Sequence, residues 1–247
     1  MVILVTSISN GINSDVQQYK SGDNLSWCYS VELNRKLGRY QLTPYLHEIT
    51  EFTRLYLAGF FTAVALFYTL RIFILKKRYQ NDVIFPGNRF CSSWWTHSLF
   101  RVFRATIWTV CVFRCFVAEI DNYLVIIPKL QIPSLMLLGN TLLTLGFCTT
   151  LLLHFMLGKQ WRSGIDPQKP TQLITNGFYR FTRNPMFLAI GLSQLGFFMA
   201  IPSVFSATCL VIGITCLAVQ TAAEEKHLTM LLPTIYNQYC DKVRRWI

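Results

Sequence analysis

Apolar stretches long enough to cross a lipid bilayer, separated by basic loops, constrain the fold of this chain more than any other feature. A membrane-spanning helix needs about 20 predominantly apolar residues. Length and flanking charge predict five such helices. They are Leu55–Leu75, Ala105–Ile127, Pro133–Leu157, Pro185–Ile201 and Ser203–Ala222. The sequence therefore predicts an all-α, multi-pass transmembrane bundle of about five spans.

The composition agrees with a membrane protein, because 52% of the 247 residues are hydrophobic and only 14% are charged. The formal net charge of +11 would suggest a nucleic-acid partner in a soluble chain. Here the basic residues lie between apolar stretches, where membrane topology and anionic headgroups account for them. We therefore expect the lipid bilayer as a partner and no nucleic acid. The eight cysteines form no CxxC pair, so neither a disulfide framework nor a metal site is predicted.

The chain divides into three parts by composition. Residues 1–50 form a polar extension without a sustained hydrophobic period, and residues 51–132 hold two spans and a basic loop. Residues 133–247 hold the other three spans and a basic tail. The loops 76–104 and 158–184 and the tail are all rich in Lys and Arg, and five spans place them on one side. The positive-inside rule makes that side the cytosol.

The second predicted span contains a charge. A mid-membrane arginine costs roughly 2.5–3.5 kcal/mol on insertion scales. Asp121 lies seven residues after Arg114, two turns along the same helix face, where it can pair with it. Arg114 is interpreted as a buried or snorkelling structural charge, with contact to a lipid headgroup as the alternative.

The last two spans form a hairpin with its turn at Pro202. A hairpin brings its outer ends together, so Arg180 and Arg183 before it should lie near Glu224 and Glu225 after it. Basic residues before a span are usually topology signals, whereas acidic residues add nothing to that signal. The carboxylates are therefore either a solvated pair, partnered by Lys226 or Arg183, or part of a binding site.

Asn184 followed by Pro185 is typical of an N-cap and the first helical position. The Asn184 side chain is expected to accept from the free amides of this helix start. The positive end of the helix and Arg183 would then suit a carboxylate or phosphate. A ligand with both a carboxylate and an ammonium, such as S-adenosylmethionine, would use both ends of the hairpin.

Short motifs in the stretch from about Leu137 to the end occur in a fixed order around this hairpin. They are Gly158-Lys-Gln160-Trp161, Leu173-Ile174-Thr175-Asn176-Gly177-Phe178-Tyr179, Arg183-Asn184-Pro185-Met186-Phe187, Glu224-Glu225-x-x-Leu228, and Tyr236-x-x-Tyr239 with a basic end. Together they resemble the membrane-embedded methyltransferases related to isoprenylcysteine carboxyl methyltransferase and phosphatidylethanolamine N-methyltransferase. No GxGxxG segment occurs, so the soluble Rossmann plan is excluded.

The resemblance implies S-adenosylmethionine bound in a cytosol-facing pocket, and a lipid-soluble or small acceptor that enters from the bilayer. Arg183 would orient cofactor groups, and Glu224 or Glu225 would take the proton of an amine acceptor. A carboxylate or thiolate acceptor needs no protein base. By position, the implied cofactor contacts are Gln160, Thr171, Gln172, Leu173, Ile174, Tyr179, Asn184, Pro185, Met186, Phe187 and Glu224.

This chain departs from the family pattern at three positions. Asn184 stands where histidine is usual and cannot titrate near neutrality, and Phe187 stands where tyrosine is usual. Gln220 stands where the carboxyl methyltransferases place an arginine on the substrate, which weakens the case for a prenylcysteine. The acceptor class stays open, as do a sterol-reductase-like oxidoreductase using NADPH and a non-catalytic protein that retains the hairpin. His154 is interpreted as a packed or capping residue.

Small residues lie on the fourth predicted span at Ala189, Ser193, Gly196 and Ala200. They would let helices approach closely, either within the hairpin or between two copies of the chain. The sequence does not decide between these arrangements, so no oligomeric state is predicted.

Overall fold

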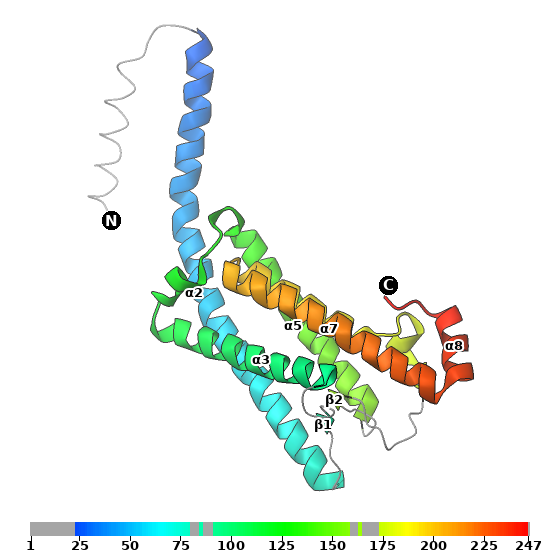
Figure 1. Ribbon diagram of the computed structural model, residues 1–247. Helices are drawn as coiled ribbons and strands as arrows, with labels where there is room; N and C mark the ends of the chain where they lie inside the picture. Colours follow the sequence, from blue (N-terminus) through cyan, green and yellow to red (C-terminus); the bar gives the residue numbers. More distant parts are fainter. Residues whose placement is uncertain (1–22, 80–83, 86–90, 159–162, 165–172, 247) are drawn as a thin grey trace. The chain divides into compact units, whose positions relative to one another are not determined.

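The computed structural model describes residues 23–79, 84–85, 91–158, 163–164 and 173–246. Its contacts divide the chain into two units, residues 1–47 and residues 48–247. The long helix α2 (Asp23–Tyr79) begins in the first unit and continues into the second. The sequence predicts no regular element before residue 51, whereas the structure is helical from Asp23 onward. All sites described below lie in the second unit (Figure 1).

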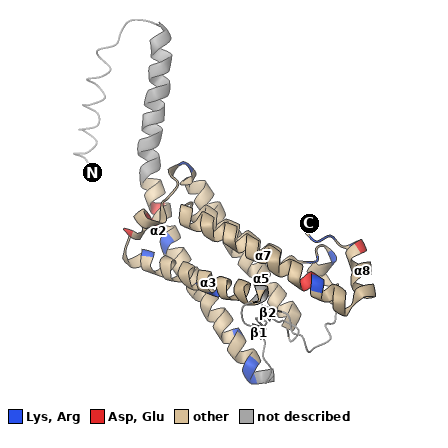
Figure 2. Cartoon of the chain, viewed as in Figure 1, with Lys and Arg blue, Asp and Glu red and all other residues tan. Residues whose placement is uncertain are grey.

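The described residues confirm an all-α membrane protein. Three helical segments are long and apolar enough to cross a membrane: Pro44–Lys77 within α2, α5 (Pro133–Leu157) and α7 (Val204–Leu231). A shorter apolar helix, α6 (Pro185–Ala200), lies between the last two in sequence. Neither α5 nor the part of α7 before Glu224 carries an acidic or basic residue other than His154, as the tan ribbon in Figure 2 shows.

The predicted bounds hold for some spans and are wrong for others. Helix α5 has the predicted bounds, and α6 ends one residue earlier than predicted. Helix α7 continues past Ala222 to Leu231, so Glu224 and Glu225 lie within a helix and not after its end. Glu, Lys and Leu are good helix formers, and they carry the helix beyond its apolar part.

The second predicted span, Ala105–Ile127, is wrong as a single helix. Helix α3 (Ser92–Phe116) starts earlier and ends earlier, and it is not among the three apolar spans found in the described residues. After it come α4 (Ile120–Leu124), where Val125 has φ of 53°, and a 3₁₀ turn at Pro128–Leu130. The break carries Asp121 back toward Arg114 on α3, which explains the early end of the helix.

Helices α5 and α6 pack backbone against backbone. An added Cβ at Gly139 would meet the backbone of Gly196 and Ala200, and one at Gly146 would meet Ser193 and the carbonyl of Ala189. The small residues of α6 therefore face α5, and intramolecular packing accounts for them. These small residues of α6 pack against α5 and not against α7, the other helix of the hairpin. Beside this seam, a buried core joins α2, α3, α5, α6 and α7 through Leu57, Cys111, Leu143, Phe197 and Cys209.

Two sets of backbone contacts define the two ends of the second unit. Strand β1 (Ile84–Phe85) pairs in parallel with β2 (Ser163–Gly164), so the segment between α2 and α3 meets the segment between α5 and α6 at one end. At the other end the backbone N–H of Ile127 donates to Pro202 at 2.8 Å. The hairpin turn is thus held against the segment after α4. Ser203 and Ser206 form a capping box at the start of α7.

Candidate functional site

The hairpin of α6 and α7 brings a basic and an acidic segment together at the end away from its turn. The Arg183 Nε atom lies 3.7 Å from Oε1 of Glu225, and Asn184 Nδ2 donates to the same oxygen at 3.1 Å. Glu225 and Asn184 are buried, and Arg183 is half-buried. The predicted convergence of guanidinium and carboxylate groups is therefore present in the structure.

Asn184 occupies the predicted N-cap position, with Pro185 as the first residue of α6, but its side chain does not cap the helix. Its amide instead donates to Glu225 and to the backbone carbonyl of Arg245 at 3.3 Å. The expectation that this side chain accepts from the helix amides is wrong. The physical reason is the buried carboxylate beside it, which needs donors more than the helix start needs an acceptor.

Both oxygens of Glu225 have partners. Arg245 donates to Oε2 from Nη2 at 2.6 Å and from Nε at 2.9 Å, while Asn184 donates to Oε1. A carboxylate held by a guanidinium fork and an amide is fixed in place, and both of its oxygens are engaged. It is poorly suited to take a proton from a substrate.

Glu224 differs from its neighbour, because it is half-buried and has a single described partner. Gln220 Nε2 donates to its Oε1 at 3.0 Å, and Thr96 of α3 donates to Gln220 at 3.5 Å. Within the described part of the chain, no residue donates to Oε2 of Glu224. Gln220, which stands where relatives have a substrate-binding arginine, here orients Glu224.

Tyr179 lies near Glu224 on the 3₁₀ turn η3 (Gly177–Arg180). Burial, together with the charge of Glu224 and the nearby Tyr239, raises the pKa of Tyr179 to about 12. The hydroxyl therefore keeps its proton at neutral pH and can donate a hydrogen bond. Its backbone carbonyl accepts from the Tyr239 hydroxyl at 2.7 Å.

The other predicted cofactor contacts in the described residues lie before η3 or in the first turn of α6. Leu173, Ile174, Met186 and Phe187 are half-buried, and Pro185 is buried. Met186 packs beside Leu75 of α2. The predicted contacts Gln160, Thr171 and Gln172 lie outside the described residues.

The contacts of the chain's last residues with the site were not predicted from the sequence. Helix α8 (Pro233–Lys242) and the residues after it run along the segment before α6. The N–H of Arg183 donates to the carbonyl of Arg244 at 3.0 Å, and the Thr182 hydroxyl donates to the carbonyl of Arg245 at 3.0 Å. A signal was available in Tyr236 and Tyr239, which lie three residues apart on one helix face and are both buried.

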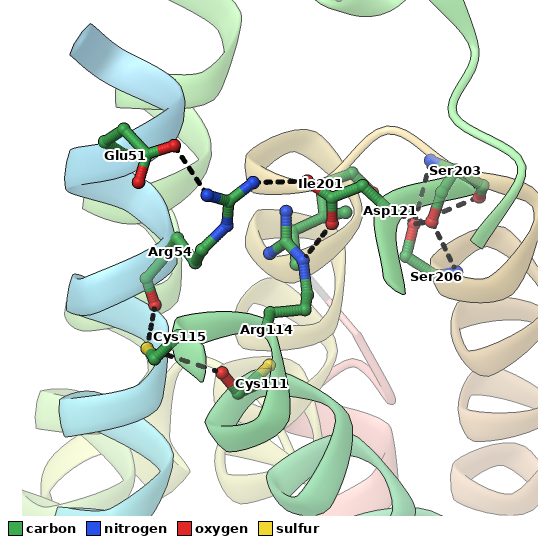
Figure 3. Close-up of polar contacts among 9 residues, drawn as sticks. All are labelled: Glu51, Arg54, Cys111, Arg114, Cys115, Asp121, Ile201, Ser203 and Ser206. Atoms are coloured by element: carbon green, nitrogen blue, oxygen red, sulfur yellow. Dashed lines mark hydrogen bonds and ion pairs between the residues drawn. The ribbon is translucent and has the colours of Figure 1, made fainter. Parts of the chain in front are cut away.

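A second polar cluster lies at the opposite end, near the hairpin turn (Figure 3). Arg114 Nε donates to Oδ1 of Asp121 at 2.5 Å, which confirms the predicted pair. Arg54 of α2 donates to Oδ2 of the same carboxylate at 2.8 Å and pairs with Glu51 at 2.5 Å, a contribution that was not predicted. Arg54 and Arg114 are buried, and the shared Asp121 carboxylate pairs with guanidinium groups that would be costly to bury alone.

Burial alone would raise the pKa of the Asp121 carboxyl. The hydrogen bonds and charges of Arg114 and Arg54 more than offset this effect and hold its pKa below the usual value. His154, on α5, is buried, and its Nε2 lies 3.3 Å from the Tyr68 hydroxyl. It packs against Phe67 and Tyr68, in agreement with its interpretation as a packed residue.

The fold and the paired charges define a multi-pass membrane protein with a polar site at one end of its last hairpin. A sequence model of the family described as phospholipid methyltransferase matches residues 134–234. This segment, which holds α5, α6, α7 and the Arg183–Glu225 contact, is similar to the phospholipid methyltransferase family. This confirms the resemblance predicted from the motifs. No curated protein and no solved structure matches the chain.

Proposed function

We propose that this membrane protein is a methyltransferase that uses S-adenosylmethionine and transfers its methyl group to a lipid-soluble or small acceptor that enters from the bilayer. The observation that carries the proposal is the convergence of Arg183, Asn184 and the Glu224–Glu225 pair at one end of the hairpin, within the segment that matches the family. Elsewhere in an apolar bundle, such a set of charges would be costly without a polar ligand or partner.

The donor set suits a ligand with one anionic and one cationic group. The Arg183 guanidinium offers donors to a carboxylate, and Oε2 of Glu224 offers an acceptor to an ammonium or to ribose hydroxyls. The protonated hydroxyl of Tyr179 adds a further donor. When bound, S-adenosylmethionine would supply an electrophilic methyl group on a sulfonium.

The two glutamates have different roles in this proposal. Glu225 has both oxygens engaged, so it positions Asn184 and Arg183 rather than reacting. Glu224 is the candidate base if the acceptor is an amine, because its Oε2 can take the proton that the amine loses. For a carboxylate or thiolate acceptor, the protein would act through alignment and exclusion of water. The uncharged Gln220, engaged with Glu224, weighs against a prenylcysteine carboxylate as acceptor.

The site faces the cytosol in this proposal. The segments that follow α2 and α5 meet through β1 and β2, and residues 76–104, residues 158–184 and the tail carry an excess of Lys and Arg. Protease protection of a C-terminal epitope in sealed membrane vesicles tests this orientation. Digestion from the cytosolic side supports it, and protection there overturns it.

Calorimetry with S-adenosylhomocysteine on the purified, folded protein tests the proposed cofactor. We expect binding by the wild type and a loss of about tenfold or more in Glu224→Gln, because a charge-assisted contact is removed. Glu119→Gln is the matched control, since Glu119 is exposed and lies on the segment between α3 and α4. Absence of binding by folded wild-type protein would overturn the proposal. Thermal protection by NADPH alone would instead favour the oxidoreductase alternative.

The acceptor is identified by profiling methylated metabolites in cells with and without the protein. A methylated lipid, thiol or amine that depends on both the protein and Glu224 would define the acceptor class. Unchanged pools, with folded variants, would favour a non-catalytic role.

A further inference from the structure

The last residues of the chain are attached to the proposed cofactor site by four successive contacts. We call Tyr239, Arg244 and Arg245 the C-terminal clamp. Its Tyr239 hydroxyl donates to the Tyr179 carbonyl, and its Arg244 carbonyl accepts from the Arg183 N–H. Its Arg245 carbonyl accepts from Thr182, and its Arg245 side chain holds Glu225. The clamp thus contacts both sides of the hairpin end.

The Arg245 contact affects the charge balance around Glu225 as well as the position of the chain's last residues. Glu225 is buried and lies between two guanidinium groups, that of Arg245 at 2.6 Å and that of Arg183 at 3.7 Å. A buried carboxylate is destabilising unless it is paired with a cation, and Arg245 makes the closer pair here. Because Arg245 already occupies Oε2, Glu225 does not need Arg183 at hydrogen-bonding distance.

The Arg183 guanidinium is therefore available to a partner other than Glu225. Its Nη1 contacts the Cys240 sulfur, a weak acceptor, and its Nε makes no hydrogen bond within the described part of the chain. A half-buried guanidinium with weak partners is suited to receive an anionic group of a ligand. Without Arg245, the Glu225 carboxylate would draw Arg183 toward itself and cancel that charge.

We propose that Arg245 is a positioning residue that neutralises Glu225, so that Arg183 stays available to bind the carboxylate of the ligand's amino-acid tail. The inference rests on the proposed function, since it assumes a zwitterionic nucleoside ligand. It assigns the C-terminal clamp a role in recognising one end of that ligand and not the nucleoside end.

Two ligands separate this role from general support of the fold. S-adenosylhomocysteine carries the amino-acid tail, whereas 5′-methylthioadenosine has the same nucleoside and thioether without it. In Arg245→Gln we expect affinity for S-adenosylhomocysteine to fall about tenfold, the usual worth of one charge-assisted contact, and affinity for methylthioadenosine to stay within about twofold. Arg245→Lys keeps the positive charge and should recover most of the loss. Lys242→Gln, which removes an exposed charge from the end of α8, should change neither affinity.

An equal loss for both ligands in Arg245→Gln would mean that the whole site collapses, and this overturns the proposal. Unchanged affinity for S-adenosylhomocysteine overturns it as well.

A readout independent of any ligand shows whether Arg245 holds the clamp. Cys240 is half-buried in contact with Arg183, so its maleimide labelling, followed by peptide mass spectrometry, should be faster in Arg245→Gln than in wild type or Lys242→Gln. Unchanged labelling overturns the attachment. If the wild type binds neither ligand while labelling still rises, the proposed cofactor fails and the attachment of the clamp stands, so the two failures are distinguishable.

Discussion

The side-chain amide of Asn184 donates a 3.1 Å hydrogen bond to the carboxylate of Glu225, and this contact ties the start of α6 to the C-terminal part of α7. The two residues are 41 positions apart, so the bond closes the hairpin at its open end. An amide suits this place because it can donate to the buried carboxylate without adding a further charge.

Replacing Asn184 should therefore destabilise the protein. Asn184→Ala removes a donor from a buried carboxylate, and we expect a loss of about 1–3 kcal/mol in the free energy of unfolding. Asn184→Asp should cost more, because it places a second carboxylate beside Glu225. Unfolding in detergent micelles measures both. Asn176→Ala is the control, since Asn176 is exposed and its side chain caps nothing, and an equal loss there would contradict this account.

Substitutions of the two neighbouring glutamates should differ in their effect on the free energy of unfolding. Glu225→Gln breaks a paired contact with Arg245 and leaves guanidinium groups without their carboxylate, so a loss of about 1.5–3 kcal/mol is expected. Glu224→Gln keeps its contact with Gln220 and should change the free energy of unfolding by no more than about 0.5 kcal/mol. Thermal and chemical unfolding of the two variants side by side make the comparison. Equal losses would show that Glu224 is also structural.

The glycines of the α5–α6 seam should not tolerate a side chain. A Cβ at Gly196 would meet the backbone of Leu143 and Gly139, which cannot move aside as a flexible side chain would. We expect Gly196→Ala to cost at least about 1–3 kcal/mol through overpacking. At Gly59 of α2, an added Cβ meets nothing within 4 Å, so Gly59→Ala should stabilise its helix by about 0.5–1 kcal/mol. Opposite signs for the two variants, measured by unfolding in micelles, are the expected result.

The sequence predicted helices where the local pattern is strong. Pro133 and Pro185 each start a helix, and the apolar residues after them continue without a charge, so the bounds of α5 and α6 could be predicted closely. The end of α7 could not, because Glu224 and Glu225 mark a change of polarity and not an end of helix. A change of polarity marks the end of the apolar helix surface, while helix propensity determines the residue at which the helix itself ends.

The site was predictable only in part, for a related reason. The Arg114–Asp121 pair, seven residues apart, was predicted from helix periodicity, although the break after α3 and not a continuous helix brings the two side chains together. Arg54 reaches the same carboxylate from 67 residues away, and Arg245 reaches Glu225 from outside the hairpin. Pairings of this kind depend on which helices are neighbours in space. That order is not encoded in the local spacing of charges.

The Asp121 cluster should make the stability of the protein sensitive to acid. The pKa of Asp121 is lower in the folded protein than its ordinary value, because Arg114 and Arg54 favour the ionised form over the effect of burial. A depressed folded pKa adds stability that is fully present above the unfolded pKa of about 3.9 and is lost as the pH falls through the folded pKa. We therefore expect the free energy of unfolding to decline below about pH 4 as this carboxylate takes up a proton.

Asp121→Asn tests this assignment, because it removes the charge at every pH. It leaves two buried guanidinium groups without their shared partner, so the free energy of unfolding near pH 7 should fall by about 3 kcal/mol or more. The variant should also lose part of the decline below pH 4 that wild type shows, since the group that titrates there is gone. Chemical unfolding in micelles between pH 7 and pH 3 measures both effects, with the exposed Glu119→Gln as a control that should follow wild type. If the free energy of unfolding of Asp121→Asn declines as steeply as that of wild type, other carboxylates cause the acid sensitivity. The Arg54–Asp121–Arg114 contacts would then contribute the same free energy at pH 7 and at pH 3.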